Sequence, residues 1–136
     1  NARGEVNSDY GTGTSYDTGT FTVNTCTPAR PVLKISAGTG FWATLGDYGT
    51  RTMSLPLTVS NPVGPGTAYN VAITGATSTN GGVTLVSTGS PVSSIIVGGS
   101  ALITVQYQVP VGVGSFRTSI SGSASDSCGT SYTYPV

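Results

Sequence analysis

The sequence contains no histidine and very few charged residues, and both absences narrow the choice of function. Five basic and five acidic residues give a net charge of zero, and charged residues make up 7% of the chain, against about a quarter in an ordinary soluble domain. Without histidine, a serine or threonine nucleophile would need the single lysine or one of five scattered carboxylates as its base. We therefore predict no catalytic residue, no cofactor and no enzymatic activity.

The balance of charge also argues against polyanionic partners. The basic residues form no cluster, so the attraction that draws proteins to nucleic acid or to anionic membranes is weak. No apolar run reaches the roughly 18 residues of a membrane-spanning helix. We therefore predict no nucleic-acid partner and no membrane insertion. A surface with little charge repels its own copies weakly, which favours packing into an assembly.

Cysteine is scarce, because Cys26 and Cys128 are the only two and lie far apart in the sequence. A zinc site needs more ligands than these, and no CxxC redox motif is present. We predict a disulfide in an oxidising compartment, which places the protein outside the cell or on its surface. Two buried free thiols are the alternative, and the sequence leaves open whether the bridge joins one chain or two.

The apolar residues recur with a period of two, which is typical of strands with one buried face. Met53, Leu55, Leu57 and Val59 alternate with serine and threonine, and Pro56 interrupts this run. Because proline donates no hydrogen bond to a ladder, we expect this strand at a sheet edge or with a bulge. Three further runs show the same alternation: Tyr69 to Ile73, Ile103 to Val109, and Phe116 to Ala124.

Glycine and proline pairs separate these runs and predict tight turns. Three shorter apolar runs, at residues 32–36, 83–87 and 92–97, complete the set. No part of the chain shows helical spacing. Short strands punctuated by glycine and proline predict an all-β fold, an antiparallel β-sandwich of about seven strands.

Three stretches carry a family resemblance: "PVLKIS" (31–36), "LTVSNPVGPGTAYNVAITG" (57–75) and "VGGSALITVQYQVPVGVGSF" (97–116). They resemble strands and turns of the immunoglobulin-like modules of prokaryotic surface proteins, including the cell-adhesion-related bacterial domain and surface repeats of undefined function. The resemblance implies an immunoglobulin-like sandwich over residues 31–125 and a surface setting. It implies little about ligands.

Both ends of the chain are expected to form strand-like arms outside this sandwich. The N-terminal arm, residues 1–30, includes a stretch from Gly19 to Ser36 that resembles the junction between two consecutive modules. The C-terminal arm, residues 126–136, contains "GTSYTYPV", which echoes "GTSYDTGT" at 13–20. An arm pairs equally well with its own sheet or with a neighbour's. We predict that residues near Phe21 and Val23 donate a strand to a neighbouring subunit.

Two ligand sites are weighed beside this structural interpretation. Phe41, Trp42 and Tyr48 lie in a glycine-rich segment and would either stack on a sugar ring or pack into a core or a subunit interface. We expect the structural use, and glycan binding is the alternative. Asp9 and Asp47 lie in turns that would suit calcium, although no EF-hand loop is present. We otherwise predict no metal site.

The resulting hypothesis is a non-enzymatic structural or adhesive module, a building unit of a surface filament, appendage or stalk. Strand pairing and the Cys26–Cys128 disulfide would hold it together. Its expected partners are copies of itself or neighbouring surface modules. The alternative is a carbohydrate- or protein-binding accessory module of a secreted protein, which would act as a monomer with exposed aromatic side chains.

Overall fold

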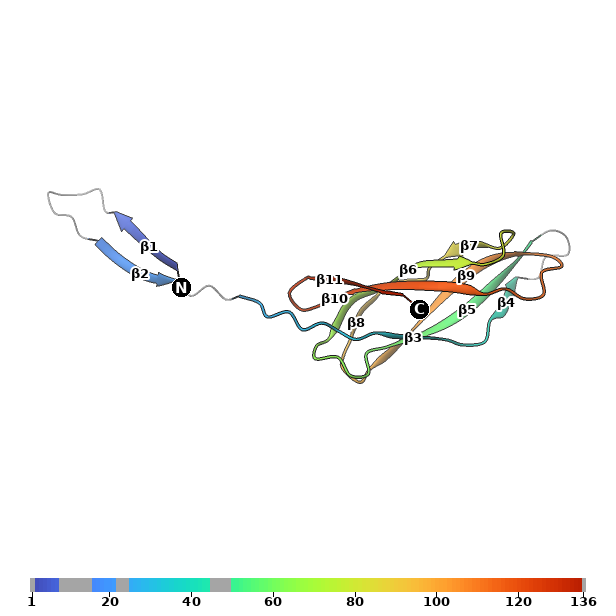
Figure 1. Ribbon diagram of the computed structural model, residues 1–136, viewed down its shortest axis with the longest axis horizontal. Helices are drawn as coiled ribbons and strands as arrows, with labels where there is room; N and C mark the ends of the chain where they lie inside the picture. The colour runs from blue at the N-terminus through green and yellow to red at the C-terminus, as the bar shows by residue number, and fades with distance from the viewer. Residues whose placement is uncertain (1, 8–15, 22–24, 45–49, 136) are drawn as a thin grey trace.

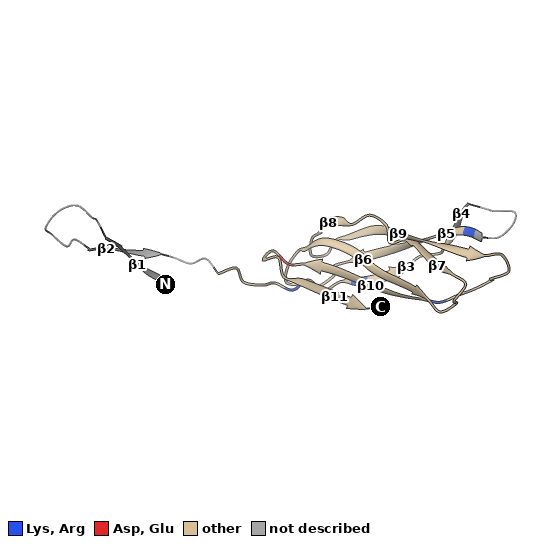
Figure 2. Ribbon diagram, turned by 90° about the horizontal axis from the view of Figure 1, so that it is seen from above, with Lys and Arg blue, Asp and Glu red and all other residues tan. Residues whose placement is uncertain are grey.

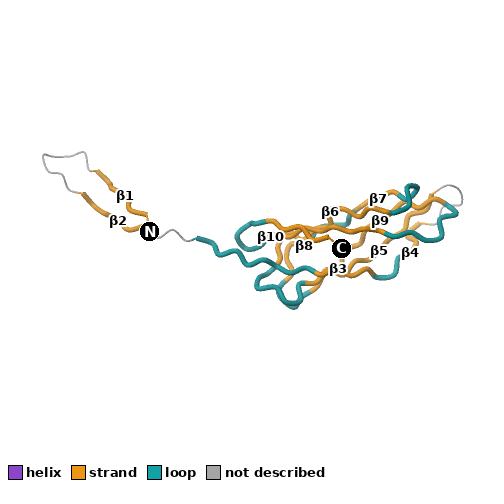
Figure 3. Tube along the Cα trace, viewed as in Figure 1, coloured by secondary structure: helices purple, strands orange, loops and turns teal. Residues whose placement is uncertain are grey.

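A computed structural model describes residues 2–7, 16–21, 25–44 and 50–135, and every regular element in these ranges is a β-strand (Figure 1 and Figure 3). Two antiparallel sheets pack face to face around a shared apolar core. The prediction of an all-β sandwich is therefore confirmed.

The first sheet has five strands and contains the longest ladder of the molecule. Its order is β3 (Lys34–Ala37), β5 (Thr50–Ser60), β9 (Ser100–Pro110) and β7 (Thr84–Ser87), and β4 (Phe41–Thr44) also pairs with β5. Strands β5 and β9 pair without interruption over 11 residues each. This ladder forms the centre of the sheet.

The second sheet has four strands, in the order β11 (Ser131–Pro135), β10 (Thr118–Ser125), β6 (Ala68–Ser78) and β8 (Val92–Ile95). Strand β11 lies within the segment 126–136, which was expected to be an arm outside the sandwich. Of the two pairings that the sequence leaves open for this arm, the structure shows the one with its own sheet, because a tight turn with Gly129 at a φ of 81° folds the segment back onto β10. The Tyr134 side chain is consequently buried in the core.

The core forms where the alternating apolar positions of both sheets meet. Leu57 and Val59 of β5 and Val105, Tyr107 and Val109 of β9 have no exposed surface. They pack against apolar side chains of the opposite sheet, including Val71, Ile73 and Ile120. Each side chain of this size contributes about 1.5–3 kcal/mol when fully buried.

Pro56 lies in a central strand, and the expectation of an edge strand or a bulge is wrong. The β5–β9 register is continuous through Pro56 and Thr104. The Pro56 carbonyl accepts a hydrogen bond of 2.8 Å from Gly38 N–H, so the proline nitrogen faces the same side, away from β9. There the chain passes from β3 to β4, and no strand requires a donor at that point.

The alternation in β6 changes phase at Asn70. Tyr69 was expected to point inward with Val71, but it is 39% exposed. Asn70 adopts a φ of 50°, and the β6–β10 register shifts between Ser123 and Ser125. The extra residue of this bulge turns Tyr69 outward and places Ala68 in the core.

The N-terminal segment forms a hairpin of its own. Strands β1 (Ala2–Asn7) and β2 (Tyr16–Phe21) pair antiparallel and form a separate two-stranded sheet. Figure 1 shows this hairpin away from the sandwich, beyond the extended chain that leads into β3. Phe21 is paired with Ala2, so β2 is half of a hairpin and not a single open strand. Val23 lies outside the described residues.

The core assignment predicts a contrast between two leucines of the same sheet. Leu57 is fully buried, whereas Leu102 is 65% exposed on β9. Leu57→Ala should lower the free energy of unfolding by about 2–5 kcal/mol, because it removes buried methyl groups and leaves a cavity. Leu102→Ala should change it by less than about 0.5 kcal/mol. Urea denaturation measures both, and equal losses would contradict the assignment.

Candidate functional site

The most elaborate group of polar contacts lies where the chain enters the sandwich. We call residues 25–33, the extended segment before β3, the strap, and we call β10, β11 and the turn between them the closing hairpin. A disulfide, an arginine over two tyrosine rings and two hydrogen bonds fasten the strap to the sandwich. These contacts form the candidate site.

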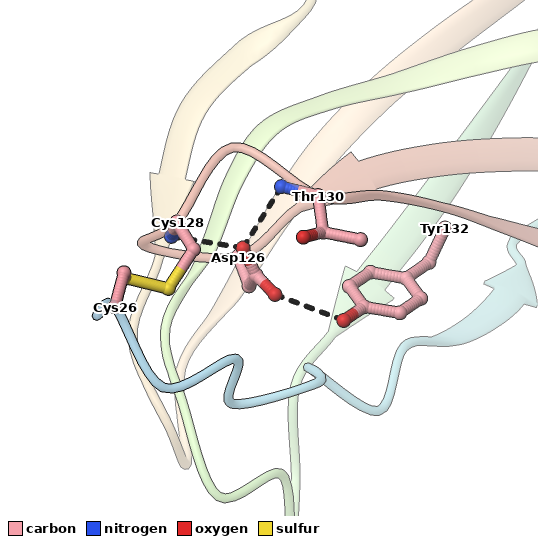
Figure 4. Close-up of a disulfide and its surroundings, with 5 residues drawn as sticks. All are labelled: Cys26, Asp126, Cys128, Thr130 and Tyr132. Atoms are coloured by element: carbon pink, nitrogen blue, oxygen red, sulfur yellow. Dashed lines mark hydrogen bonds between the residues drawn. A yellow bond between two sulfur atoms is a disulfide. The ribbon is translucent and has the colours of Figure 1, made fainter.

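The disulfide joins Cys26 of the strap to Cys128 of the closing hairpin within one chain (Figure 4). The two Cα atoms are 5.6 Å apart, and the bridge spans a sequence separation of 102 residues. The predicted disulfide is therefore confirmed. By restricting the unfolded chain, a bridge that closes a loop of this length contributes about 4.7 kcal/mol to stability.

Asp126 organises the turn that carries Cys128 (Figure 4). Its Oδ1 atom accepts hydrogen bonds from the backbone N–H groups of Cys128, at 2.8 Å, and Thr130, at 2.9 Å. Its Oδ2 atom accepts a bond of 2.8 Å from the Tyr132 hydroxyl. An aspartate that bonds to the backbone ahead of it favours this kind of turn. The carboxylate thereby fixes the position of Cys128 opposite the strap.

These contacts shift the pKa values of both partners. Burial raises the pKa of the Asp126 carboxyl, but the hydrogen bonds from Thr130, Tyr132 and Cys128 outweigh burial, so the pKa lies below its ordinary value. The hydrogen bond to Asp126 is the main cause that raises the pKa of the Tyr132 hydroxyl, and burial adds to it. At neutral pH the pair is therefore a carboxylate bonded to a neutral phenol.

Arg30 and Pro31 attach the middle of the strap to β11. The Arg30 guanidinium carbon lies 5.2 Å from the ring centre of Tyr132 and 6.0 Å from that of Tyr134. A cation over an exposed aromatic face contributes about 0.5–1 kcal/mol. The Tyr134 hydroxyl donates a buried hydrogen bond to the Pro31 carbonyl. The strap thus follows β11 in the same chain direction, from Cys128 towards Tyr134.

Asn61 fastens the end of the strap from the opposite side. Its side chain is fully buried, and its Oδ1 atom accepts a hydrogen bond of 3.2 Å from Val32 N–H. Its amide nitrogen donates to the carbonyls of Gly66, at 2.9 Å, and Ile95, at 3.2 Å. Asn61 therefore joins the strap, the β5–β6 loop and the end of β8.

The glycines of the β5–β6 loop permit this close approach. A Cβ atom at Gly66 would lie 2.6 Å from the Ala29 carbonyl oxygen. A Cβ atom at Gly64 would overlap with Asn61 Oδ1 and lie 2.9 Å from Val32 N. The run "NPVGPG" at 61–66 thus lies against the strap, and only residues without a side chain fit at these two points.

The predicted ligand residues do not join this site. Phe41 and Trp42 lie on β4, opposite Ser54 and Met53 of β5, and the structure does not describe their side chains. Tyr48 and the two calcium candidates, Asp9 and Asp47, lie outside the described residues. The predictions of glycan and calcium binding therefore stay predictions.

One apolar pocket of about 240 Å³ opens near β4, on the edge of the core, and is lined by Gly40, Met53, Leu55 and the segment 113–116 with Thr118. It contains no ionisable side chain. Among the described residues, no three His, Cys, Asp or Glu side chains lie close enough together to hold a metal ion. Nor do these residues form any helix that could cross a membrane.

Sequence reasoning identified the cysteines but missed Asn61, Asp126 and Arg30. The first two have a local signal, because Asn61 precedes a Pro/Gly loop and Asp126 precedes a glycine turn. Arg30 has none, since its tyrosine partners are about 100 residues away in the sequence and meet it only in the folded chain. The described contacts of this site fasten segments together and present no reactive group beyond the disulfide.

Removing the Asn61 side chain tests how much the strap depends on it. Asn61→Ala should lower the free energy of unfolding by at least about 3 kcal/mol, because three backbone groups, one in a buried and two in partly buried hydrogen bonds, lose their partner. Asn80→Ala is the matched control, since Asn80 makes one exposed side-chain bond to Gly82 N–H, and it should cost less than about 1 kcal/mol. A loss of the same size in both variants, measured by denaturation, would show that Asn61 fastens nothing.

The lowered pKa of Asp126 predicts a loss of stability in acid. A group whose pKa is lower in the folded than in the unfolded state stabilises the fold above its unfolded pKa, which is about 3.9 for aspartate. This contribution disappears as the pH falls through the lower folded pKa. Between pH 5 and pH 2 the melting temperature should therefore fall more steeply in the wild type than in Asp126→Asn. Parallel pH profiles would contradict the role of the carboxylate.

The chain was compared with protein-family models, with curated proteins and with solved structures, and none of the three comparisons gives a match. The resemblance to immunoglobulin-like surface modules therefore stays a prediction from the sequence.

Proposed function

We propose that the chain is a non-enzymatic extracellular module with a structural or adhesive role, a building unit of a surface filament, appendage or stalk. The observation that carries this proposal is the covalent attachment of the strap to the closing hairpin, which joins the entering and the leaving strands of the sandwich. Such a connection strengthens a unit whose ends are pulled, whereas it brings no group into position for catalysis.

The distribution of charge supports a role in packing. The ribbon of the sandwich in Figure 2 is almost entirely tan, because few of its residues are charged. Of those described, Arg30 and Asp126 both belong to the contacts between the strap and the closing hairpin. Other modules can approach such a surface closely, because its polar groups are mainly the hydroxyls of serine and threonine and the amide of glutamine. Few charges lose their hydration on contact, and few like charges repel each other.

The strand order supports the immunoglobulin-like resemblance. Constant-type immunoglobulin domains place strands A, B, E and D in one sheet and G, F and C in the other. Taking β3 as A, β5 as B and β9 as E, the first sheet here has the order A-B-E-D with β7 as D. The second sheet has the order G-F-C for β11, β10 and β6, and β8 extends it.

The N-terminal hairpin supports contact with a neighbouring module. An isolated two-stranded hairpin is at best marginally stable in water, and a third strand or a packed face is needed. Among the described strands, β1 and β2 each pair only with the other, so the outer edge of each has no partner among them. We therefore revise the donated element from a single strand near Phe21 and Val23 to the whole hairpin.

The sequence of that hairpin indicates what it would join. Ser8-Asp9 and Gly13 to Tyr16 repeat the letters of Ser125-Asp126 and Gly129 to Tyr132 in the closing hairpin. The registers agree as well, because Tyr16 pairs with Asn7 and Tyr132 pairs with Ala124, each just before the Ser-Asp pair. The neighbour that suits it is a sandwich of the same kind, whose β6-like strand would pair with β1 as β6 pairs with β10.

The disulfide also bears on location. A disulfide between Cys26 and Cys128 is compatible with a non-reducing environment. Secretion and a place on the cell surface follow from the same proposal, because structural disulfides persist mainly outside the cytosol.

A second candidate function is a carbohydrate- or protein-binding accessory module. The observation in its favour is the pocket near β4, which includes Gly40, directly before Phe41 and Trp42. Aromatic side chains are the groups that would stack on the face of a sugar ring in such a module. This candidate requires a monomer whose Trp42 fluorescence changes when a glycan is added.

Deleting the N-terminal hairpin tests the structural proposal. The variant that lacks residues 1–24 should keep the melting temperature of the sandwich, because in Figure 1 the hairpin lies away from it. It should lose the ability to form assemblies, which sedimentation velocity and electron micrographs of the concentrated protein would measure.

The matched control replaces residues 1–24 by a glycine/serine linker of equal length, which keeps the chain length but removes the paired strands. It should behave as the deletion does. Normal polymers from either variant would refute assembly through the hairpin. A full-length chain that stays monomeric and binds an oligosaccharide would favour the accessory module instead.

A further inference from the structure

The position of the disulfide determines which part of the chain carries tension. We infer that a pulling force applied to the two ends of this chain passes through the Cys26–Cys128 bridge and β11, and bypasses the rest of the sandwich. The inference rests on the proposed function for its biological meaning, since only a stalk or filament unit is pulled in this way. Its physical content concerns the isolated chain.

The bridge shortens the covalent path between the two ends of the chain. Tension in a chain follows the shortest covalent connection between the points at which it is pulled. From the N-terminal side that connection enters at Cys26, crosses to Cys128 and continues into β11, whereas the backbone route between the two cysteines is 102 residues long. Residues 27–127 therefore lie in a closed loop that carries no tension, and this loop contains β3 to β10.

Strand β11, the part of the sandwich that remains on the path, can gain almost no length. Strand β11, Ser131 to Pro135, is already extended, and a strand rises about 3.4 Å per residue. The limit for a fully stretched chain is about 3.3–3.6 Å per residue. Pulling along β11 therefore gains almost no length, even if its hydrogen bonds to β10 are lost.

Without the bridge the load would take a different route. It would pass through the strap into β3, an edge strand that pairs with β5 over four residues. Loss of β3 would uncover Ile35 and the Leu57 and Val59 side chains behind it, which belong to the core. The sandwich would then unfold, and the 102-residue separation would extend by roughly 340 Å.

The contacts of the strap acquire a distinct role in this scheme. Arg30, Pro31 and Val32 all lie inside the closed loop and are not part of the covalent path, although Arg30 and Pro31 contact Tyr132 and Tyr134 of β11 and Val32 bonds to Asn61. They keep Cys26 beside the Asp126 turn, where Cys128 is held by a backbone hydrogen bond to Asp126. The described structure thus separates the groups that position the bridge from the bridge that bears the load.

Force spectroscopy on the full chain tests the inference directly. The chain is tethered through its two ends and stretched before and after treatment with dithiothreitol, which donates two electrons and two protons to the bridge and becomes a cyclic disulfide. Cys26 is exposed and Cys128 is half-buried, so the reductant reaches the bridge. The same molecule is thereby its own control.

The oxidised chain should lengthen by no more than about 120 Å, which is the full reach of residues 1–25 and 129–136. After reduction it should gain roughly 340 Å more. If the bridge were not formed in the folded chain, the long step would appear at the same length before and after reduction. A step of several hundred Å in the oxidised chain, or no additional length after reduction, would overturn the inference.

Two variants separate the load path from stability. Asn61→Ala weakens the sandwich and leaves both cysteines in place, so its oxidised chain should still show only the short lengthening. The double variant Cys26→Ser with Cys128→Ser should show the long extension without reductant, whether or not its sandwich folds. A long extension in oxidised Asn61→Ala would mean that the bridge does not form once the sandwich is weakened, and it would overturn the inference.

The result is independent of the proposed function. If the bypass is found but the chain forms no assembly with or without its N-terminal hairpin, the load path stands and the filament or stalk role fails. If assemblies form through the hairpin but the oxidised chain unravels, the structural role stands and the bypass fails.

Discussion

The strap supplies the hydrogen-bond partners for buried polar groups at the end of the sandwich where the chain enters. Asn61 and Asp126 are almost completely buried, and Tyr134 is nearly so. Asn61 Oδ1 and the Tyr134 hydroxyl find their partners on the strap, at Val32 and Pro31. Buried polar groups without partners cost about 1–3 kcal/mol each. Removing the strap would therefore leave polar groups unsatisfied at the edge of the core, and the disulfide keeps the strap in place.

The same arrangement is the main support for the proposed structural role. The few charged groups that the structure describes near the strap serve the fold: Arg30 covers two tyrosine rings, and Asp126 caps a turn. The lowered pKa of Asp126 results from hydrogen bonds within that turn. Hydrogen-bond networks with a purely structural role also shift pKa values in this way. The disulfide then joins the two places at which the chain enters and leaves the sandwich, which is where a neighbouring module or a pulling force would act.

Much of the fold was predictable because one physical signal dominates it. Alternation in Leu55 to Val59 and Ile103 to Val109 identified the two central strands, since one face of each is buried. The signal failed at Tyr69, where a bulge at Asn70 changes the phase, and at Pro56, whose missing donor faces a break between strands. The sequence around a residue does not indicate which strand it pairs with or in which register. Both wrong predictions, for Tyr69 and for Pro56, depend on that pairing.

The site was harder to predict because its contacts span the length of the chain. The cysteines were recognisable by type alone, but their neighbours were not. Pro31 meets Tyr134 across a separation of 103 residues, and Asn61 meets Ile95 across 34. The C-terminal segment was assigned to an arm because its letters echo the N-terminal hairpin. Its actual place in the sheet depends on β10, which a local reading of the segment does not include.

The central claim is that the strap is an integral part of the folded module. Native-state hydrogen exchange measures this at single residues. We expect the N–H groups of Val32 and Thr130, which are bonded to Asn61 and Asp126, to be protected as strongly as the amides of β9 in the core. Exchange of Val32 at the rate of an unstructured peptide, while β9 stays protected, would contradict the central claim.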